Sequence, residues 1–298
     1  MLTPTPNLTR ELALLAALAT LWGASYTFIS VAVQTIPPLT LMACRTLLAG
    51  LLLLAILHAR GLRLPTHAGT WRKFAFQACL NSVLPFTLIA WGQQMVEASL
   101  ATILNSATPI FAFLITALIT RHEAVTARKL IGVVAGLMGI TLVLGVEALG
   151  GLGQAFWSQL AIVSACIAFA CAAIFGKNFQ SLDPLMPAAG SLLCGAALLV
   201  PASLIVDQPW TLSPSRASVL ALLGLSVFST ALAFAIYFRL MRTLGSIGTT
   251  SQAYLRVPIG VAIGVVFLGE SLRSTALWGL VFVVVGVAAM TIPTRSAK

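Results

Sequence analysis

The sequence predicts an all-α integral membrane protein with ten transmembrane helices, arranged as two inverted five-helix repeats (5+5). Three observations carry this prediction. Of the 298 residues, 59% are hydrophobic and only 8% are charged, whereas a soluble domain carries roughly 25% charged residues. Apolar runs of about 20 residues, the length that a bilayer-spanning helix requires, follow one another along the chain. Finally, a pattern of residues in the first half recurs in the second half.

Each apolar run in turn has the length and composition of a spanning helix. The runs are expected at residues 11–33, 38–58, 72–92, 97–120, 127–146, 154–176, 185–206, 215–238, 246–268 and 274–292. The longest stretch between them, Ala59 to Trp71, is too short to bury a core of its own. The first run is longer than the apolar part of a signal peptide and leads into further spans, so it is expected to remain in the mature protein.

The basic residues lie mostly on one side of this expected bundle, and such a bias marks the cytoplasmic side. With the N-terminus inside, the outer loops hold only Arg216 and Arg273. The inner segments hold Arg10, Arg60, Arg63, Arg72, Lys73, Arg121, Arg128, Lys129, Lys177, Arg239, Arg242, Arg295 and Lys298. We therefore expect both termini in the cytoplasm. The net charge of +10 then reflects topology, and no nucleic-acid partner is expected.

An internal repeat organises the chain. The same distance along the sequence separates the members of three pairs, which are Glu123 and Glu270, Gly132 and Gly279, and Gly139 and Gly286. The segment Pro109-Ile recurs as Pro258-Ile, and Pro38-Leu has a weaker counterpart in Pro184-Leu. Such self-similarity indicates that one structural unit is duplicated. We divide the chain into a first five-helix repeat, residues 1–148, and a second, residues 149–298.

Because each repeat has an odd number of spans, the second copy must cross the membrane in the opposite direction. The loop charges agree with this inversion. The loop after the fourth span is basic, with Arg121, Arg128 and Lys129, whereas its counterpart after the ninth span has Arg273 alone. Inverted repeats are a recurring architecture of secondary transporters, whose two half-bundles rock around a site near the bilayer midplane. The expected site therefore lies between the halves.

These residues also carry a family resemblance over nearly the whole chain. Asn105-Ser-Ala-Thr-Pro109, Glu123, Gly132-x6-Gly139 and their second copies resemble the EamA family of the drug/metabolite transporter (DMT) superfamily. The resemblance implies a bacterial inner-membrane exporter of amino acids and small metabolites, aromatic amino acids among them. A proton-coupled exporter of another metabolite or drug is the alternative. The segment Tyr254-Leu-Arg256-Val-Pro258 departs from the family pattern, in which an acidic or apolar residue often adjoins the proline.

Two arginines fall inside expected spans, where a charge is costly and indicates function by default. Arg256 lies near the middle of the ninth span, with no acidic residue deep in any span. Its planar guanidinium suits a carboxylate ligand; alternatively, it binds carbonyl groups freed at the Pro258 kink. Arg45 lies about seven residues into the second span and is expected to extend toward the interface instead.

Further candidates are the polar residues near the proline breaks and the aromatic residues deep in the spans. Such polar groups can line a wet cavity, although each can equally bond between helices. Pro109 and Pro258 are expected as a hinge or gate, since proline frees a helix carbonyl, although kinks also serve packing. Gly132 and Gly136, like Gly260 and Gly264, predict close helix contacts. The expected substrate-binding residues are Trp22, Tyr26, Gln77, Asn81, Asn105, Phe169, Ser251, Gln252, Tyr254 and Arg256.

The remaining chemistry is sparse. Glu97, Glu123 and Glu270 lie at span ends, in solvated or helix-capping positions, so we expect gradient-driven transport without obligatory proton exchange. The histidines and the five cysteines lack metal-ligand spacing, and no metal or other cofactor is expected. An intramembrane enzyme is disfavoured because Ser25 has no histidine deep in a span to act as its base. The expected partners are a small-molecule substrate and the lipid bilayer, with the protein a monomer.

Overall fold

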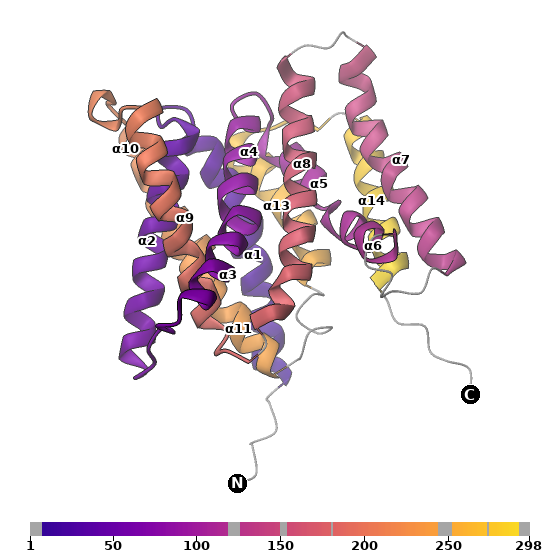
Figure 1. Ribbon diagram of the computed structural model, residues 1–298. Coiled ribbons are helices and arrows are strands. Elements are labelled where there is room, and N and C mark those ends of the chain that lie inside the picture. The colour runs from indigo at the N-terminus through magenta and orange to yellow at the C-terminus, as the bar shows by residue number, and fades with distance from the viewer. Residues whose placement is uncertain are drawn as a thin grey trace, which may run out of the picture.

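The computed structural model describes residues 8–118, 126–149, 154–179, 181–243, 252–272 and 274–291. Within these ranges the regular structure is helical, without a strand, and the helices form an upright bundle (Figure 1). In chain order the elements are α1 (Leu8–Ala32), α2 (Pro38–Ala59), α3 (Ala68–Ala78), η1 (Cys79–Val83), α4 (Leu84–Gly92), α5 (Ala98–Asn105), α6 (Thr108–Leu118), α7 (Ala127–Leu149), α8 (Gln154–Phe175), η2 (Gly176–Phe179), α9 (Leu185–Val206), η3 (Pro209–Thr211), α10 (Arg216–Ser226), η4 (Val227–Leu232), α11 (Ala233–Thr243), α13 (Gln252–Leu268) and α14 (Ser274–Thr291).

These helices fall where the apolar runs predict them. The expected span at 185–206 coincides with α9, and the third, fourth and eighth runs are each a series of helical segments that continue one another. The ninth run begins with residues 246–251, which lie outside the described part, and continues as α13. Seven helical stretches are long and apolar enough to cross a membrane, and two shorter apolar helices occupy Leu255–Leu268 and Ser274–Gly286.

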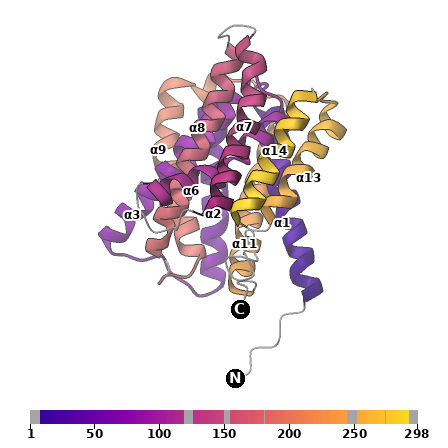
Figure 2. The ribbon, with the colours of Figure 1, turned by 90° about the vertical axis from the view of Figure 1, so that its right-hand side faces the viewer.

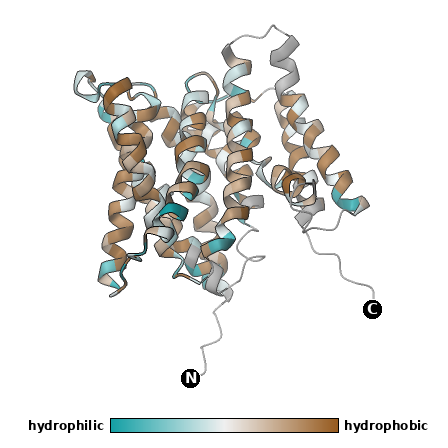
Figure 3. Cartoon of the chain, in the orientation of Figure 1, coloured by the Kyte–Doolittle hydropathy of each residue, from teal (hydrophilic) through white to brown (hydrophobic). Residues whose placement is uncertain are grey.

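The surface of the bundle has the character of a membrane protein. Large apolar side chains are widely exposed on it, including Leu220 (68%), Ile205 (76%) and Phe267 (76%). Apolar residues cover the middle of the helices in Figure 3. A continuous apolar surface of this kind is unfavourable in water, and hydrocarbon covers it without cost. The described chain is therefore built to reside in a bilayer.

The two halves of the chain interlock rather than stand apart. Helix α7 packs along α14, α2 along α9, and α1 along α13; Figures 1 and 2 both show α7 beside α14. Corresponding helices of the two halves make corresponding contacts. Thus α1 contacts α13 as α8 contacts α5 and α6, and α4 contacts α8 as α11 contacts α1.

Glycines permit the closest of these contacts, as the sequence predicts for both four-residue glycine pairs. A Cβ on Gly260 would lie 3.2 Å from the Cα of Gly23, where α1 and α13 meet. A Cβ on Gly286 would lie 2.5 Å from the carbonyl oxygen of Gly132 and 2.7 Å from the amide nitrogen of Gly136. Backbones this close leave no room for a side chain, which is how small residues drive helix association in membranes.

The sequence does not predict the two π-helical segments, which are also a matched pair. The segment η1 separates α3 from α4, and η4 separates α10 from α11. Ser82 in η1 and Ser229 in η4 are separated by the same distance along the chain as Glu123 and Glu270. Both serines are buried, and neither hydroxyl has a hydrogen-bond partner among the described residues. Short π-helical segments are frequent at functional sites.

Acidic side chains join the halves at the helix ends. The Glu270 carboxylate accepts hydrogen bonds from the backbone amides of Ala98 (2.6 Å) and Ser99 (2.8 Å) at the start of α5, and from the Ser99 hydroxyl. Asp207 similarly accepts from the amide (2.7 Å) and hydroxyl (2.8 Å) of Thr40, near the start of α2. A carboxylate at these positions satisfies amides that lack a partner within the helix. Of the two roles that the sequence leaves open for Glu270, solvated or helix-capping, the structure shows helix capping.

Candidate functional site

Arg45 lies inside the bundle, not at its edge. It is 6% exposed, its guanidinium carbon lies 3.8 Å from the centroid of the Phe86 ring, and its Nε donates to Thr230 Oγ1 over 3.0 Å. The expectation that Arg45 extends toward the interface is therefore wrong. The reason is physical: Phe86 of α4 supplies a cation–π contact and Thr230 of η4 an acceptor, and together they offset part of the cost of burial.

Arg256 is the fifth residue of α13 and is half-buried. Its Nε is buried without a hydrogen-bond partner. The sequence analysis left open whether Arg256 binds carbonyl groups at the Pro258 kink, and no such bond forms within the described residues. Gly23 of α1 faces the backbone here, since a Cβ on Gly23 would lie 3.1 Å from the Arg256 carbonyl oxygen. The position of Arg256 is thus set by close packing of α1 against α13, and its donors stay available.

Tyr26 of α1 brings the two arginines into one region. It is 5% exposed; Gly23, one helical turn before it, packs against the Arg256 backbone, and Phe86, which lies under Arg45, belongs to α4, whose end contacts Tyr26. Gln93 donates from Nε2 to the Tyr26 carbonyl oxygen over 2.9 Å, which ties the end of α4 to α1. The consecutive helices α1 and α2 and the distant helix α13 therefore place a phenol and two cations in one interior region.

Aromatic rings complete one wall of this region. Phe169 of α8 packs edge to face against Phe86 at 6.1 Å between centroids, and Phe86 in turn lies under Arg45. Trp22, in contrast, faces α11, with Phe234 at 6.1 Å and Tyr237 at 5.4 Å. The structure therefore joins Phe169 to the arginine region and places the Trp22 ring in a separate aromatic cluster.

Three predicted amide side chains are buried or half-buried with one polar atom unpaired among the described residues. Gln77 donates to the Ala172 carbonyl over 3.2 Å but leaves Oε1 free. Asn105 accepts from Thr108 over 3.3 Å and leaves Nδ2 free, and Gln252 leaves Oε1 free. Buried polar atoms are normally paired with protein or water. Unpaired atoms on separate helices are the pattern expected where water or a solute enters.

The other predicted residues are placed as follows. Asn81 lies half-buried in η1. Ser251 lies outside the described residues, as does the side chain of Tyr254. Pro109 is the second residue of α6, directly after the break that separates α5 from α6, whereas Pro258 lies inside the continuous helix α13. The two prolines are thus not at equivalent helix breaks.

Sequence reasoning missed Phe86, Thr230 and the two serines of the π-helical segments. Nothing in the local pattern distinguishes Phe86 from other apolar residues of its span, because its role comes from the position of Arg45 on another helix. Ser82 and Ser229 did carry a signal, since they share the spacing of the repeat. Extending the repeat comparison to polar residues would have found them.

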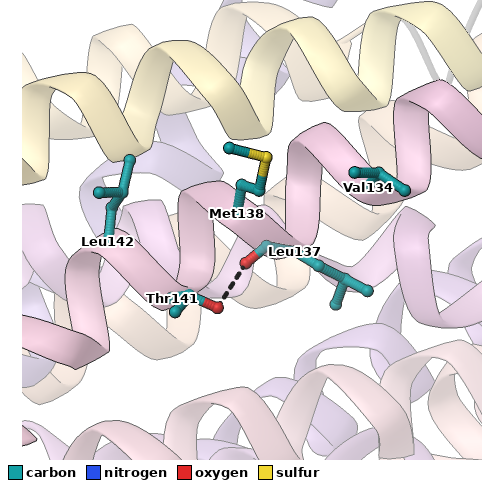
Figure 4. Close-up of a pocket in the computed structure, with 5 residues that line it drawn as sticks. All are labelled: Val134, Leu137, Met138, Thr141 and Leu142. Carbon is teal, nitrogen blue, oxygen red and sulfur yellow. Dashed lines mark hydrogen bonds between the residues drawn. The ribbon is translucent and has the colours of Figure 1, made fainter.

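A groove on the outer side of α7 is unsuited to a polar solute (Figure 4). It is lined by Val134, Leu137, Met138, Thr141 and Leu142. The Thr141 hydroxyl is the polar group of this lining, and it donates to the Leu137 carbonyl over 2.9 Å within the same helix. The other four side chains are between 37% and 57% exposed. The groove presents only apolar surface, as a lipid-facing position would.

Fold and site together define a class: a helical integral membrane protein with interlocked halves and unpaired cations in its interior, suited to moving a solute. Comparison with known proteins narrows this class. The chain belongs to the EamA-like transporter family, whose family model matches it twice, at residues 9–145 and 156–292. It is therefore a membrane transporter and not an enzyme, as the sequence predicts.

Individual relatives and one solved structure agree with this assignment. The chain is 29% identical to the uncharacterized inner membrane transporter YedA of Escherichia coli K12, with 91% of this chain and 88% of the relative covered. It is 26% identical to the probable amino-acid metabolite efflux pump of Salmonella typhimurium, with 89% of each covered. A crystal structure of a protein at 16% identity has the same fold, with a TM-score of 0.67 over 95% of this chain and 97% of the other.

Proposed function

We propose that this transporter exports amino acids and related small metabolites, aromatic amino acids among them, by alternating access between two half-bundles. The half-bundles are the inverted five-helix repeats, residues 1–148 and 149–298, which cross the membrane ten times with both termini in the cytoplasm. The double match of the family model supports the duplication. The corresponding contacts that equivalent helices of the two halves make support the inverted arrangement. A relative named as a probable amino-acid metabolite efflux pump supports the solute class.

One observation carries the proposal: Arg45 and Arg256 lie around Tyr26 in the interior, and no described carboxylate pairs with either. A guanidinium binds a carboxylate through two parallel hydrogen bonds, and every amino acid has a carboxylate. In this proposal Arg256 binds that group, while Tyr26 and Phe169 contact the solute side chain. Contacts to the rest of the solute come from Gln77, Asn81, Asn105, Ser251, Gln252 and Tyr254, whereas Trp22, predicted as a further contact, packs in the separate cluster against α11.

Conformational change in this proposal uses the prolines and needs no proton. Pro258 leaves a carbonyl of α13 without an amide donor, so α13 bends there more easily than elsewhere, and Pro109 lies directly after the break between α5 and α6, where the chain can also hinge. Three described acidic side chains have structural partners: Glu11 pairs with Arg239 at 2.9 Å, and Asp207 and Glu270 cap helices. Transport is then driven by the solute gradient, and we propose that a monomer suffices for it.

Counterflow tests this proposal. Purified protein in liposomes preloaded with an unlabelled amino acid is expected to accumulate the same labelled amino acid from outside. Arg256→Ala is expected to lower this exchange at least about tenfold, the effect of losing roughly 1.4 kcal/mol or more of solute binding. Arg216→Ala, at the first position of α10, serves as the control and should exchange normally. Equal exchange by wild type and Arg256→Ala would make Arg256 structural, and no amino-acid exchange at all would exclude this solute class.

A further inference from the structure

The interior region around Tyr26 carries more positive charge than one carboxylate neutralises. Arg256 packs through its backbone against Gly23, one turn before Tyr26, and Arg45 lies over Phe86 of α4, the helix whose end binds Tyr26 through Gln93. The acidic side chains that the structure describes lie at or near the helix ends, where Glu11 pairs with Arg239. The others are Glu97 just before α5, Asp183 just before α9, Asp207 just after α9 and Glu270 just after α13. Within the described residues the two guanidinium groups therefore have no acidic counterpart.

The helix packing around Arg45 does not require a charged residue at this position. It follows Pro38 by the same number of residues as Ser191 follows Pro184, so the repeat places Ser191 of α9 at the corresponding position. Ser191 is also buried, at 2% exposed, and donates only to the Ala188 carbonyl of its own helix over 3.2 Å. The same fold element thus accepts a small neutral residue in one copy. A buried cation in the other copy calls for a separate reason.

The donors of both arginines are incompletely used. Arg45 donates from Nε to Thr230, and its Nη1 lies 3.9 Å from the Met42 sulfur, which is a weak acceptor. Its Nη2 has no partner among the described residues. Arg256 makes no hydrogen bond to a described residue, and its Nε is buried. Two planar groups with free N–H donors match two acidic groups, or one doubly charged group, better than they match a single carboxylate.

We propose that the site selects solutes with net negative charge and two acidic groups, such as dicarboxylates and the acidic amino acids, over neutral zwitterions. This inference rests on the proposed function and narrows its solute class, since neutral amino acids, the aromatic ones included, are then exchanged more slowly than acidic ones. A zwitterion neutralises one guanidinium but brings an ammonium group beside the other, where no described carboxylate receives it. A second acid group on the solute is attracted by that same guanidinium. Selectivity follows from repulsion of the zwitterion as much as from attraction of the dianion.

Matched solute pairs test this inference in counterflow at neutral pH. Glutamate and glutamine differ by an acid and an amide of nearly equal size, as do aspartate and asparagine, and succinate has two acid groups without an ammonium. Wild-type protein is expected to exchange glutamate, aspartate and succinate at least about tenfold faster than the amides. In Arg45→Gln this preference should shrink to within about twofold, because one of the two cations is gone. Arg60→Gln, at the exposed end of the same helix, should retain the preference.

The outcomes separate this inference from the proposed function. Exchange of the amides as fast as the acids, or an acid preference unchanged in Arg45→Gln, would overturn the selectivity for acidic solutes. Exchange of neutral amino acids alone would overturn it too, yet leave amino-acid transport intact. No exchange of any amino acid would overturn the proposed function, whereas exchange of succinate alone would retain the charge selectivity. The wild-type comparison does not depend on whether a variant folds.

Discussion

Gly286→Leu is expected to abolish the accumulation of folded protein. Gly286 lies where α14 meets α7, and the three atoms nearest to an added Cβ would be backbone atoms of Gly132 and Gly136, at 2.5–3.0 Å. Backbone atoms cannot rotate away as a flexible side chain can. The two helices would have to separate along their whole contact, and overpacking of a close contact costs typically about 1–3 kcal/mol even where neighbours can adjust.

The measurement is the yield of monodisperse protein after extraction in mild detergent. Gly286→Leu is expected at less than about a tenth of the wild-type yield, since folded fractions fall tenfold for each 1.4 kcal/mol once stability is exhausted. Gly176→Leu is the matched control, because no atom lies within 4 Å of a Cβ added there, and its yield should stay within about twofold of wild type. Normal yield of Gly286→Leu would show that α7 and α14 do not pack this closely.

Much of the fold is predictable because the bilayer imposes a length on each apolar run. The bounds of α9 are read from the sequence without error, and α14 begins at the residue that the sequence predicts. The interruptions of the helices are harder to predict. A π-helical segment such as η1 shifts one hydrogen bond by one residue and leaves hydropathy unchanged, so periodicity does not reveal it.

The candidate site is predictable in part for a related reason. A charge in an apolar run is conspicuous, which is why Arg256 stands out in the sequence. Whether such a charge reaches an interface depends on its neighbours from other helices, and the Arg45 prediction failed on that point. Phe86 and Thr230 come from α4 and η4, and their meeting with α2 is decided by packing between the halves. Single-sequence reasoning has no access to that packing.

The two halves also show that a repeat in the sequence does not guarantee the same local backbone structure in both copies. Pro109 and Pro258 match in the sequence, yet one begins a helix after a break and the other lies inside a helix. The duplicated pattern preserves helix positions and glycine contacts, whereas local backbone geometry has diverged between the copies. Asymmetry of this kind is needed for a site that binds an asymmetric solute. Arg45 and Ser191, which occupy equivalent positions in the two repeats, are another instance of it.

Glu270→Ala is expected to destabilise the protein strongly although Glu270 follows α13 and is only half-buried. The carboxylate accepts from two backbone amides and one hydroxyl of Ala98 and Ser99, and both of those residues are fully buried. Removing the acceptor leaves the two buried amides unpaired, each at a cost of about 1–3 kcal/mol, whereas the Ser99 hydroxyl still has the Val261 carbonyl as an acceptor at 3.3 Å. Gly264, which faces the carboxylate, has no side chain that could replace it for the amides.

Thermal unfolding in detergent measures this effect. We expect the apparent melting temperature of Glu270→Ala to fall by about 10 °C, since each kcal/mol corresponds to roughly 2–4 °C in a protein of 150–250 residues. Glu270→Gln keeps one carbonyl oxygen as acceptor, so its apparent melting temperature should lie between those of the wild type and Glu270→Ala. The cap joins the end of α13 to the start of α5, so both variants should also exchange solute more slowly, in the same order. Wild-type stability of Glu270→Ala would mean that the start of α5 finds other acceptors, and that this link does not hold the halves together.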